Sequence, residues 1–276
     1  MGIVLHTLAA LGYALLAARP WYALLHTGTV GTHAYERYAL PLVLILHGAG
    51  LYFSMHGSHG LYLGLGLAIS STLWLGMLVY WVESLFVEVS ILRLLLLPVA
   101  AVAAFVPVVL PDRVLVAHAS NPWMIAHLVV SLAAYGIMTV AALHALLTAA
   151  TDSHLHRPQE STQGNGVWRE LIERMPPLLT LEHLLFRLIW IGFILLSLAV
   201  VSGSGISLSL GGSIFPFDHK TIFTLLAWLT FGLLLVGRRL RGWRGRVAVR
   251  YTLAGLVLLL LAYIGTRFVI EFILKR

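Results

Sequence analysis

The sequence contains no cysteine and few charged residues. Without cysteine, the 276-residue chain has no disulfide, no thiolate metal ligand and no thioredoxin-type redox motif. It also lacks a Walker loop, a dinucleotide-binding glycine motif and a zinc-protease motif. Charged residues make up 11% of the chain and hydrophobic residues 59%, a composition too apolar for a soluble domain.

The sequence contains long apolar runs with few charged residues. A run of about 20 apolar residues spans a bilayer, and such runs recur along the whole sequence. Their apolar residues are continuous and do not alternate with polar ones, which favours helices over a membrane β-barrel. The first run has no charged segment before it and no cleavage motif after it, so we expect a retained span and not a signal peptide.

The fold class predicted is all-α, a polytopic membrane protein with about eight transmembrane helices. The predicted spans are Ile3–Ala18, Tyr38–Met55, Leu61–Val82, Leu92–Leu110, Pro122–Ala149, Leu181–Val201, Thr221–Gly237 and Val247–Ile273. We expect residues 1–276 to form a single integral membrane domain. Its largest connections are a cytoplasmic loop at 151–180 and a glycine- and serine-rich outer loop at 202–220.

Basic residues predict the orientation. The net charge of +7 comes from arginines that gather in short connections, above all between spans seven and eight, as the positive-inside rule expects for the cytoplasmic side. This distribution argues against nucleic acid as a partner. Both termini are then on the outer, periplasmic side of a bacterial inner membrane, and Lys275 and Arg276 are a small exception. The partner implied is the lipid bilayer.

Two of the 13 histidines lie inside apolar runs. Ionisable groups are expensive in hydrocarbon and usually serve a function there, and imidazole is a common ligand of buried haem iron. His47 lies roughly 10 to 12 Å and His127 roughly 8 Å below the outer interface, at about 1.5 Å per helical residue. Two helices that carry histidine at one level can ligate a single iron. The alternative is that each imidazole only hydrogen-bonds a neighbouring helix.

Charged residues near the outer side are candidates for contacts to an anionic group. Asp218, His219 and Lys220 lie at the outer start of span seven, where an acidic residue is also an ordinary helix cap. His219 is a reserve metal ligand. Arg267 on span eight pairs with Glu271 four residues later, or holds a carboxylate such as a haem propionate.

Several segments resemble one family. Ser120 through His127, followed by Ser131 and Tyr135, resembles the histidine-bearing helix of CcsA-type cytochrome c assembly proteins. Three later segments resemble the spans that follow it in that family: Glu182 through Gly203, Lys220 through Trp228, and the loop Gly242-Trp243-Arg244-Gly245-Arg246 with Leu261 through Gly265. The likeness covers most of the chain and is nearest to the YpjD/HemX-like inner-membrane branch.

The resemblance implies eight spans and haem handling at the outer membrane face. By position, His47 matches the family's intramembrane histidine of an early span, and His127 matches its outer histidine. One loop departs from the family pattern Trp-x-Trp-Asp-Pro-Lys-Glu, because residues 215–220 read Phe-Pro-Phe-Asp-His-Lys. Two family histidines are also missing, one near the end of span seven and one after span eight, so that His219 stands as a substitute ligand.

The function predicted is haem binding related to cytochrome c biogenesis. The cofactor expected is haem b, with iron ligands His47 and His127 and with propionates directed toward Arg267 or Lys220. Other membrane proteins or cytochrome assembly components are possible partners. One alternative is an accessory or scaffold subunit, not an enzyme, that has lost haem handling. A small-solute transporter ranks last, because no Asp or Glu lies in the middle of a span.

Overall fold

The computed structural model describes residues 1–26, 36–58, 60–86, 92–111, 114–155, 177–214 and 218–265. Within these ranges eight helices are long and apolar enough to cross a membrane, which confirms the predicted helical membrane class. The elements are α1 (Gly2–His26), α2 (Glu36–Met55), β1 (His56–Gly57), β2 (Gly60–Leu61), α3 (Leu65–Ser84), α4 (Leu92–Val109), α5 (Pro122–Leu155), α7 (Leu178–Ser209), α8 (His219–Arg241), α9 (Arg246–Leu260) and the π-helical turn η2 (Leu261–Gly265).

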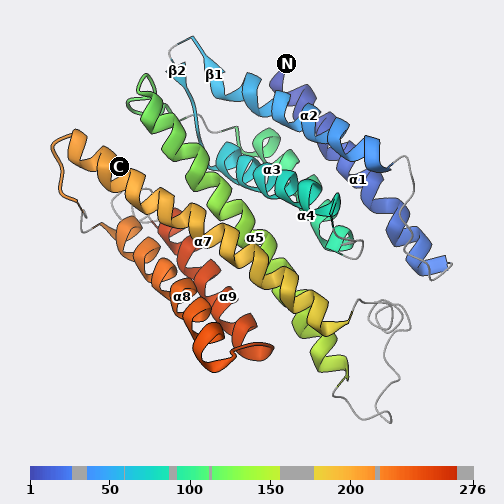
Figure 1. The fold of residues 1–276 in the computed structure, drawn as a ribbon. Coiled ribbons are helices and arrows are strands. Elements are labelled where there is room, and N and C mark those ends of the chain that lie inside the picture. The colour runs from blue at the N-terminus through green and yellow to red at the C-terminus, as the bar shows by residue number, and fades with distance from the viewer. Residues whose placement is uncertain are drawn as a thin grey trace. The chain divides into compact units, whose positions relative to one another are not determined.

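The chain divides into two compact units. Unit 1 consists of Met1–Ser120 with Ala150–Leu178, and unit 2 of Asn121–Ala149 with Leu179–Arg276. In unit 1, α1 packs against α2 and α4, and α3 packs against the same two helices. Figure 1 shows the α1–α2 pair in blue and the α3–α4 pair in cyan to teal. In unit 2, α8 packs against α9 and η2.

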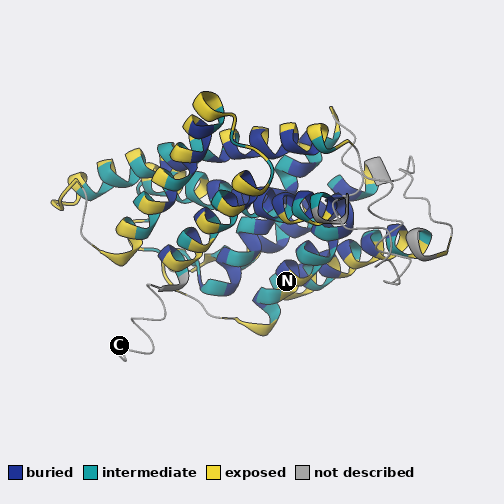
Figure 2. Ribbon diagram, turned by 90° about the horizontal axis from the view of Figure 1, so that it is seen from below, coloured by how far each residue is buried: buried dark blue, intermediate teal, exposed yellow. Residues whose placement is uncertain are grey.

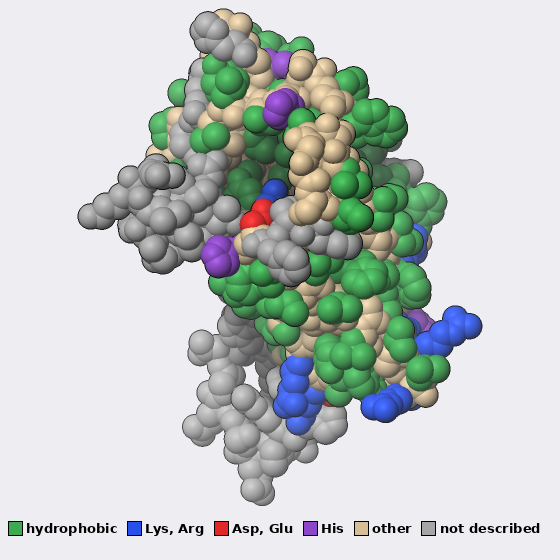
Figure 3. Space-filling view, turned by 90° about the vertical axis from the view of Figure 1, so that its left-hand side faces the viewer, with side chains coloured by type: hydrophobic (Ala, Val, Ile, Leu, Met, Phe, Trp, Pro, Cys, Tyr) green, Lys and Arg blue, Asp and Glu red, His purple; other side chains and the backbone are tan. Residues whose placement is uncertain are grey.

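The surface of both units carries large apolar side chains. Leu15 is 73% exposed, Ile45 68% and Val201 69%. Exposed positions alternate with buried ones along the helices in Figure 2. Hydrophobic side chains cover much of the face drawn in Figure 3, where lysine and arginine occupy only a few places. This surface matches a lipid environment, because a soluble protein rarely exposes such extended apolar patches.

Several helices are longer than the predicted spans, and α8 (His219–Arg241) exceeds the predicted Thr221–Gly237 at both ends. α1 continues past Ala18 to His26 with Pro20 inside it, which transmembrane helices tolerate. α5 continues to Leu155. α7 begins at Leu178 and continues to Ser209, so the first part of the predicted loop 202–220 is helical. The hydroxyls of Ser202 and Ser209 explain this extension, because each bonds a carbonyl three residues back and is thereby satisfied in a helix.

One short β-hairpin departs from the all-α prediction. β1 pairs with β2 in antiparallel fashion after α2. Tyr62 then forms a bridge with Leu115, and the amide of Val116 donates to the carbonyl of Leu61 at 2.8 Å. The connection after α2 and the connection after α4 therefore meet at one end of unit 1. Alternating spans require this arrangement, because both connections must lie on the same side of the membrane.

Both ends of α8 are capped by the groups that the sequence offers. The carboxylate of Asp218 accepts from the amide of Thr221 at 2.7 Å, which satisfies a free N–H of the first turn. At the other end Gly242 has φ of 65°, a left-handed conformation that glycine adopts without steric cost. Its amide donates to the carbonyls of Arg238 and Gly237, and α9 starts after Gly245.

Candidate functional site

His127 in unit 2 is held by a hydroxyl from the neighbouring helix. Its Nδ1 lies 2.8 Å from the Oγ of Ser202 on α7. The Oγ of Ser202 also lies 3.2 Å from the carbonyl oxygen of Ala199, and a hydroxyl that donates its proton there accepts from the imidazole. We therefore assign the proton of His127 to Nδ1 from the hydrogen-bond pattern, which leaves Nε2 with a lone pair.

A glycine and a lysine lie near this ring. A Cβ added to Gly203 would lie 3.1 Å from Cε1 of His127 and 3.7 Å from its Nε2. Gly203 therefore leaves space beside the lone pair that any larger residue would occupy. Lys220 at the start of α8 is near enough for its charge to act on the His127 ring. His219 and Lys220 are both exposed, and Asp218 is engaged as the cap of α8.

His47 in unit 1 is fully buried, at 0% exposure. Its Nε2 lies 2.8 Å from the Oγ of Ser70 on α3, and its Nδ1 lies 3.4 Å from the hydroxyl of Tyr13 on α1. Both ring nitrogens thus have hydrogen-bond partners inside unit 1. His47 and His127 belong to different units, so their joint ligation of one iron stays a prediction.

A second imidazole in unit 1 lies against His47. The rings of His6 and His47 meet edge to face, with centroids 5.9 Å apart and planes at 75°. Tyr13 approaches His47 in the same way at 5.6 Å. Gly50 permits the close approach of α2 to α1, because a Cβ there would lie 3.3 Å from the backbone N of His6. Unit 1 therefore contains a buried polar cluster of His6, Tyr13, His47 and Ser70.

Sequence reasoning found two of these histidines and missed their partners. Ser202 was assigned to a loop, so its place beside His127 was not expected. His6 lies in the first span, which was the shortest predicted. A signal was present, because His6, Tyr13 and Ala17 recur at helical spacing and all three are buried. Arg267, the predicted propionate partner, lies outside the described residues.

A further buried imidazole lies in unit 2. His144 is 1% exposed, and its Nε2 lies 2.8 Å from the carbonyl oxygen of Leu181. A carbonyl only accepts, so Nε2 carries the proton. The remaining nitrogen, Nδ1, has no hydrogen-bond partner among the residues that the structure describes. Buried imidazoles in this protein are therefore more numerous than the two predicted as ligands.

Comparison with known proteins identifies a family and relatives of this chain. The model of the family described as "Cytochrome C assembly protein" matches residues 4–274. The inner membrane protein YpjD of Escherichia coli is 31% identical over 185 residues, which is 65% of this chain and 65% of that protein. The cytochrome c biogenesis protein CcsA of Parasynechococcus marenigrum is 28% identical over 180 residues, 59% of each chain. No solved structure matches this chain.

The matched relatives indicate the membrane location of this protein as well as its family. The chain matches at most 65% of the length of these two relatives. Eight apolar helices of spanning length and the inner-membrane relative together show a multi-pass inner-membrane protein. Since the family match extends over nearly all of its residues, this chain belongs to the cytochrome c assembly protein family.

Proposed function

We propose that this protein binds a b-type haem near the outer face of the inner membrane and holds or presents it during cytochrome c biogenesis. The observation that carries the proposal is the geometry of His127. Its Nδ1 lies 2.8 Å from the Ser202 hydroxyl, and metal-ligating histidines almost always donate the N–H of their second nitrogen to a hydrogen-bond partner. The free lone pair on Nε2 next to Gly203 fits an iron ligand.

The other predicted residues have roles around this ligand. Lys220 acts electrostatically on the site and is exposed, as a contact for a haem propionate requires; Arg267 is the second predicted contact. His219 is the reserve ligand. His47 is the ligand that the sequence predicts from unit 1. A bound haem would supply one-electron chemistry at its iron, while the helices supply a dry, apolar surrounding.

The relatives favour a role in haem delivery. CcsA is named a cytochrome c biogenesis protein, and the formation of cytochrome c requires haem at the outer membrane face. The outer location proposed here follows from the arginines of the α8–α9 connection, which the positive-inside rule assigns to the cytoplasm. Because His127 is near the start of α5 and the Asp218–Lys220 segment starts α8, both are then at the outer ends of their helices.

A visible absorption spectrum tests haem binding. The full chain, expressed with adequate haem and purified in detergent, is expected to show a Soret band that His127→Ala removes or strongly diminishes. His118→Ala is the matched control, because His118 is exposed in a connection and belongs to no proposed site. If the wild-type chain carries no Soret band, the proposal is wrong.

A second candidate is an accessory subunit without a cofactor. The observation in its favour is that both nitrogens of His47 are occupied by Tyr13 and Ser70, as expected for an imidazole that only joins helices. Purification of a stoichiometric membrane partner together with a haem-free chain would support this function and exclude the first.

A further inference from the structure

Six arginines gather where α8 meets α9 at one end of unit 2. They are Arg238, Arg239, Arg241, Arg244, Arg246 and Arg250. No Asp or Glu lies between His219 and Leu260, the outer bounds of these two helices. Figure 1 shows α8 and α9 side by side with a short connection between them. Positive charges concentrated at one end of two packed helices attract an anionic partner.

The acidic residues of unit 2 do not balance this charge. Glu182 on α7 is 8% exposed, its carboxylate accepts from the amide of Gly245 at 2.8 Å, and its charge acts on Arg238. Asp218, the other acidic residue among those described in unit 2, caps the opposite end of α8. One carboxylate cannot neutralise six guanidinium groups, so this end of unit 2 keeps a net positive charge.

The connection that carries the arginines is packed against both helices. A Cβ added to Gly237 of α8 would lie less than 3.0 Å from three ring atoms of Trp243, so the indole occupies the space that this glycine leaves. The same ring lies against Tyr251 of α9, with centroids 5.1 Å apart. The bond from Gly245 to Glu182 fastens the connection to α7 as well. The backbone therefore holds the arginines in defined places, unlike those of a loose basic tail.

Two of the arginines lie on an exposed stripe of α9. Arg246, Arg250, Ala254 and Val257 are all exposed, and their spacing of three or four residues places them on one face of the helix. Arg250 is roughly 6 Å further along the helix axis than Arg246, at 1.5 Å per residue. The stripe starts with two guanidinium groups and continues with apolar side chains. A phospholipid presents its phosphate and its acyl chains in the same order.

The chemistry of the guanidinium group favours a lipid phosphate. A charged side chain on the lipid-facing side of a membrane helix is costly unless it extends to the interface or finds a polar partner. A guanidinium donates two parallel N–H bonds to phosphate oxygens, whereas a lysine offers only a point charge. Clusters of basic residues at the membrane ends of helices are typical of sites for anionic headgroups. A zwitterionic lipid fits less well, because the positive cluster repels its ammonium group.

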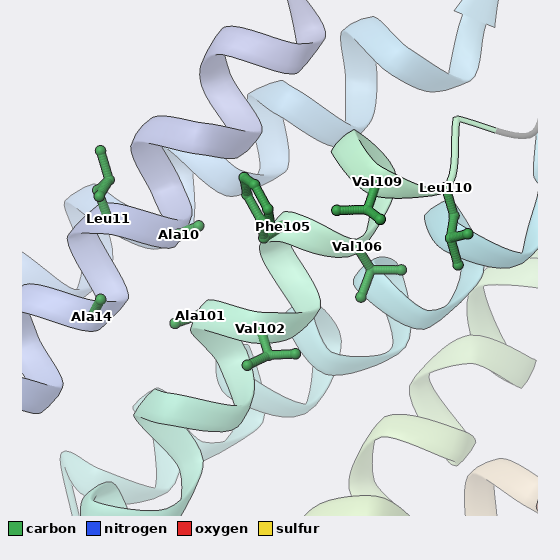
Figure 4. Close-up of a pocket in the computed structure, with 9 residues that line it drawn as sticks. All are labelled: Ala10, Leu11, Ala14, Ala101, Val102, Phe105, Val106, Val109 and Leu110. Carbon is green, nitrogen blue, oxygen red and sulfur yellow. The ribbon is translucent and has the colours of Figure 1, made fainter.

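The apolar groove of unit 1 provides a contrast. It lies between α1 and α4, has a volume of about 470 Å³, and is lined only by apolar residues, among them Ala14, Val102 and Phe105 (Figure 4). Acyl chains can lie against such a surface whatever their headgroup is. Selection of one lipid class therefore depends on the arginines of unit 2 and not on this groove.

We propose that Arg246 and Arg250 bind the phosphate of an anionic phospholipid, whose acyl chain lies along Ala254 and Val257. The other four arginines add to the positive potential around that phosphate. The site requires only that this end of α9 is at a membrane surface. It is independent of haem binding and of which membrane face is cytoplasmic.

Native mass spectrometry of the full chain, purified in detergent and offered equal amounts of phosphatidylglycerol and phosphatidylethanolamine, tests the site. The wild type is expected to bind phosphatidylglycerol about 10-fold more tightly, given the contribution of each basic residue near anionic lipid. Replacing both stripe residues, Arg246→Gln with Arg250→Gln, is expected to remove this preference. Equal binding of the two lipids by the wild type would overturn the proposal.

A second pair of arginines is the matched control. Arg239→Gln with Arg241→Gln removes the same charge from exposed residues of α8 that lie off the stripe, and it should lower the preference less than about threefold. Equal losses in the two double variants would show only a diffuse effect of charge and would overturn the site. Ala14→Phe, which fills the groove of unit 1, should leave the preference unchanged.

Two further measurements keep the test decisive. If the glutamine pair does not insert into the membrane, Arg246→Lys with Arg250→Lys keeps the charge and is expected to lower the preference about threefold, because lysine lacks the bidentate geometry. An unchanged preference in that variant would contradict recognition by the guanidinium groups. Added inorganic phosphate should not displace the lipid at equal concentration. Displacement would assign the arginines to a soluble anion and overturn the lipid site.

Discussion

At the scale of single residues, one hydroxyl decides which nitrogen of the His127 ring carries the proton. In the assigned tautomer, the Ser202 hydroxyl accepts from Nδ1 while its own proton goes to the carbonyl of Ala199. Without this acceptor, either nitrogen of the ring could carry the proton, and the ring could rotate. The proposed ligand would then lose its preorganisation, although the imidazole itself would remain.

Ser202→Ala tests this relationship. We expect haem affinity to fall by about 10-fold, in the range found when a supporting partner of a metal ligand is removed, with the low-spin spectrum retained at saturating haem. Haem titration of the apoprotein measures the affinity. Ser209→Ala is the control, because Ser209 is exposed on the same helix and bonds only the carbonyl of Ile206. Equal affinities in both variants would show that the hydroxyl does not position His127.

The sequence predicted isolated residues better than their partners. An ionisable residue in an apolar run is conspicuous, so His47 and His127 were found without a structure. Asp218 was recognised as a possible cap because it precedes a helical pattern. Tyr13, Ser70 and Ser202 were missed because their contacts bring together residues from different helices, and helix packing is not visible in one sequence.

At the scale of helices, the packing of α8 on α9 depends on a residue without a side chain. A Cβ added to Gly255 would lie less than 3.0 Å from three atoms of the Phe231 ring, and Phe231 is 0% exposed. In contrast, a Cβ on Gly205 in α7 would meet nothing within 4 Å. The same substitution should therefore have opposite effects at the two positions.

Gly255→Ala is expected to destabilise the protein by about 1–3 kcal/mol through overpacking. Gly205→Ala is expected to leave stability unchanged or to raise it by up to about 1 kcal/mol, because alanine favours a helix. Thermal unfolding in detergent measures both. A Gly255→Ala protein as stable as the wild type would show that α8 and α9 are less closely packed than the structure indicates.

Hydropathy predicted that the helices exist but not where all of them end. The apolar runs gave eight spans because each is long enough to cross a bilayer. The end of α7 was misplaced because serine and glycine are typical of loops in soluble proteins. In this helix the serine hydroxyls bond to preceding carbonyls, a gain that counts where water is scarce.

At the scale of the whole molecule, orientation in the membrane is a prediction from charge. Because the chain has no cysteine, a single introduced thiol can be labelled without background. Ser58 in the connection after α2 and Arg241 at the end of α8 are both exposed. Ser58→Cys is expected to react with an impermeant maleimide on intact spheroplasts, and Arg241→Cys only after permeabilisation. The reverse pattern would place the proposed haem site on the cytoplasmic side.

We propose that this family member carries haem on imidazoles that its helices supply. The most direct measurement is haem content per chain, by pyridine haemochrome assay on the purified full-length protein. We expect a b-type haem in the wild type that is depleted when His47 and His127 are replaced together. A well-folded chain without haem, or an undiminished haem content in that double variant, would contradict it.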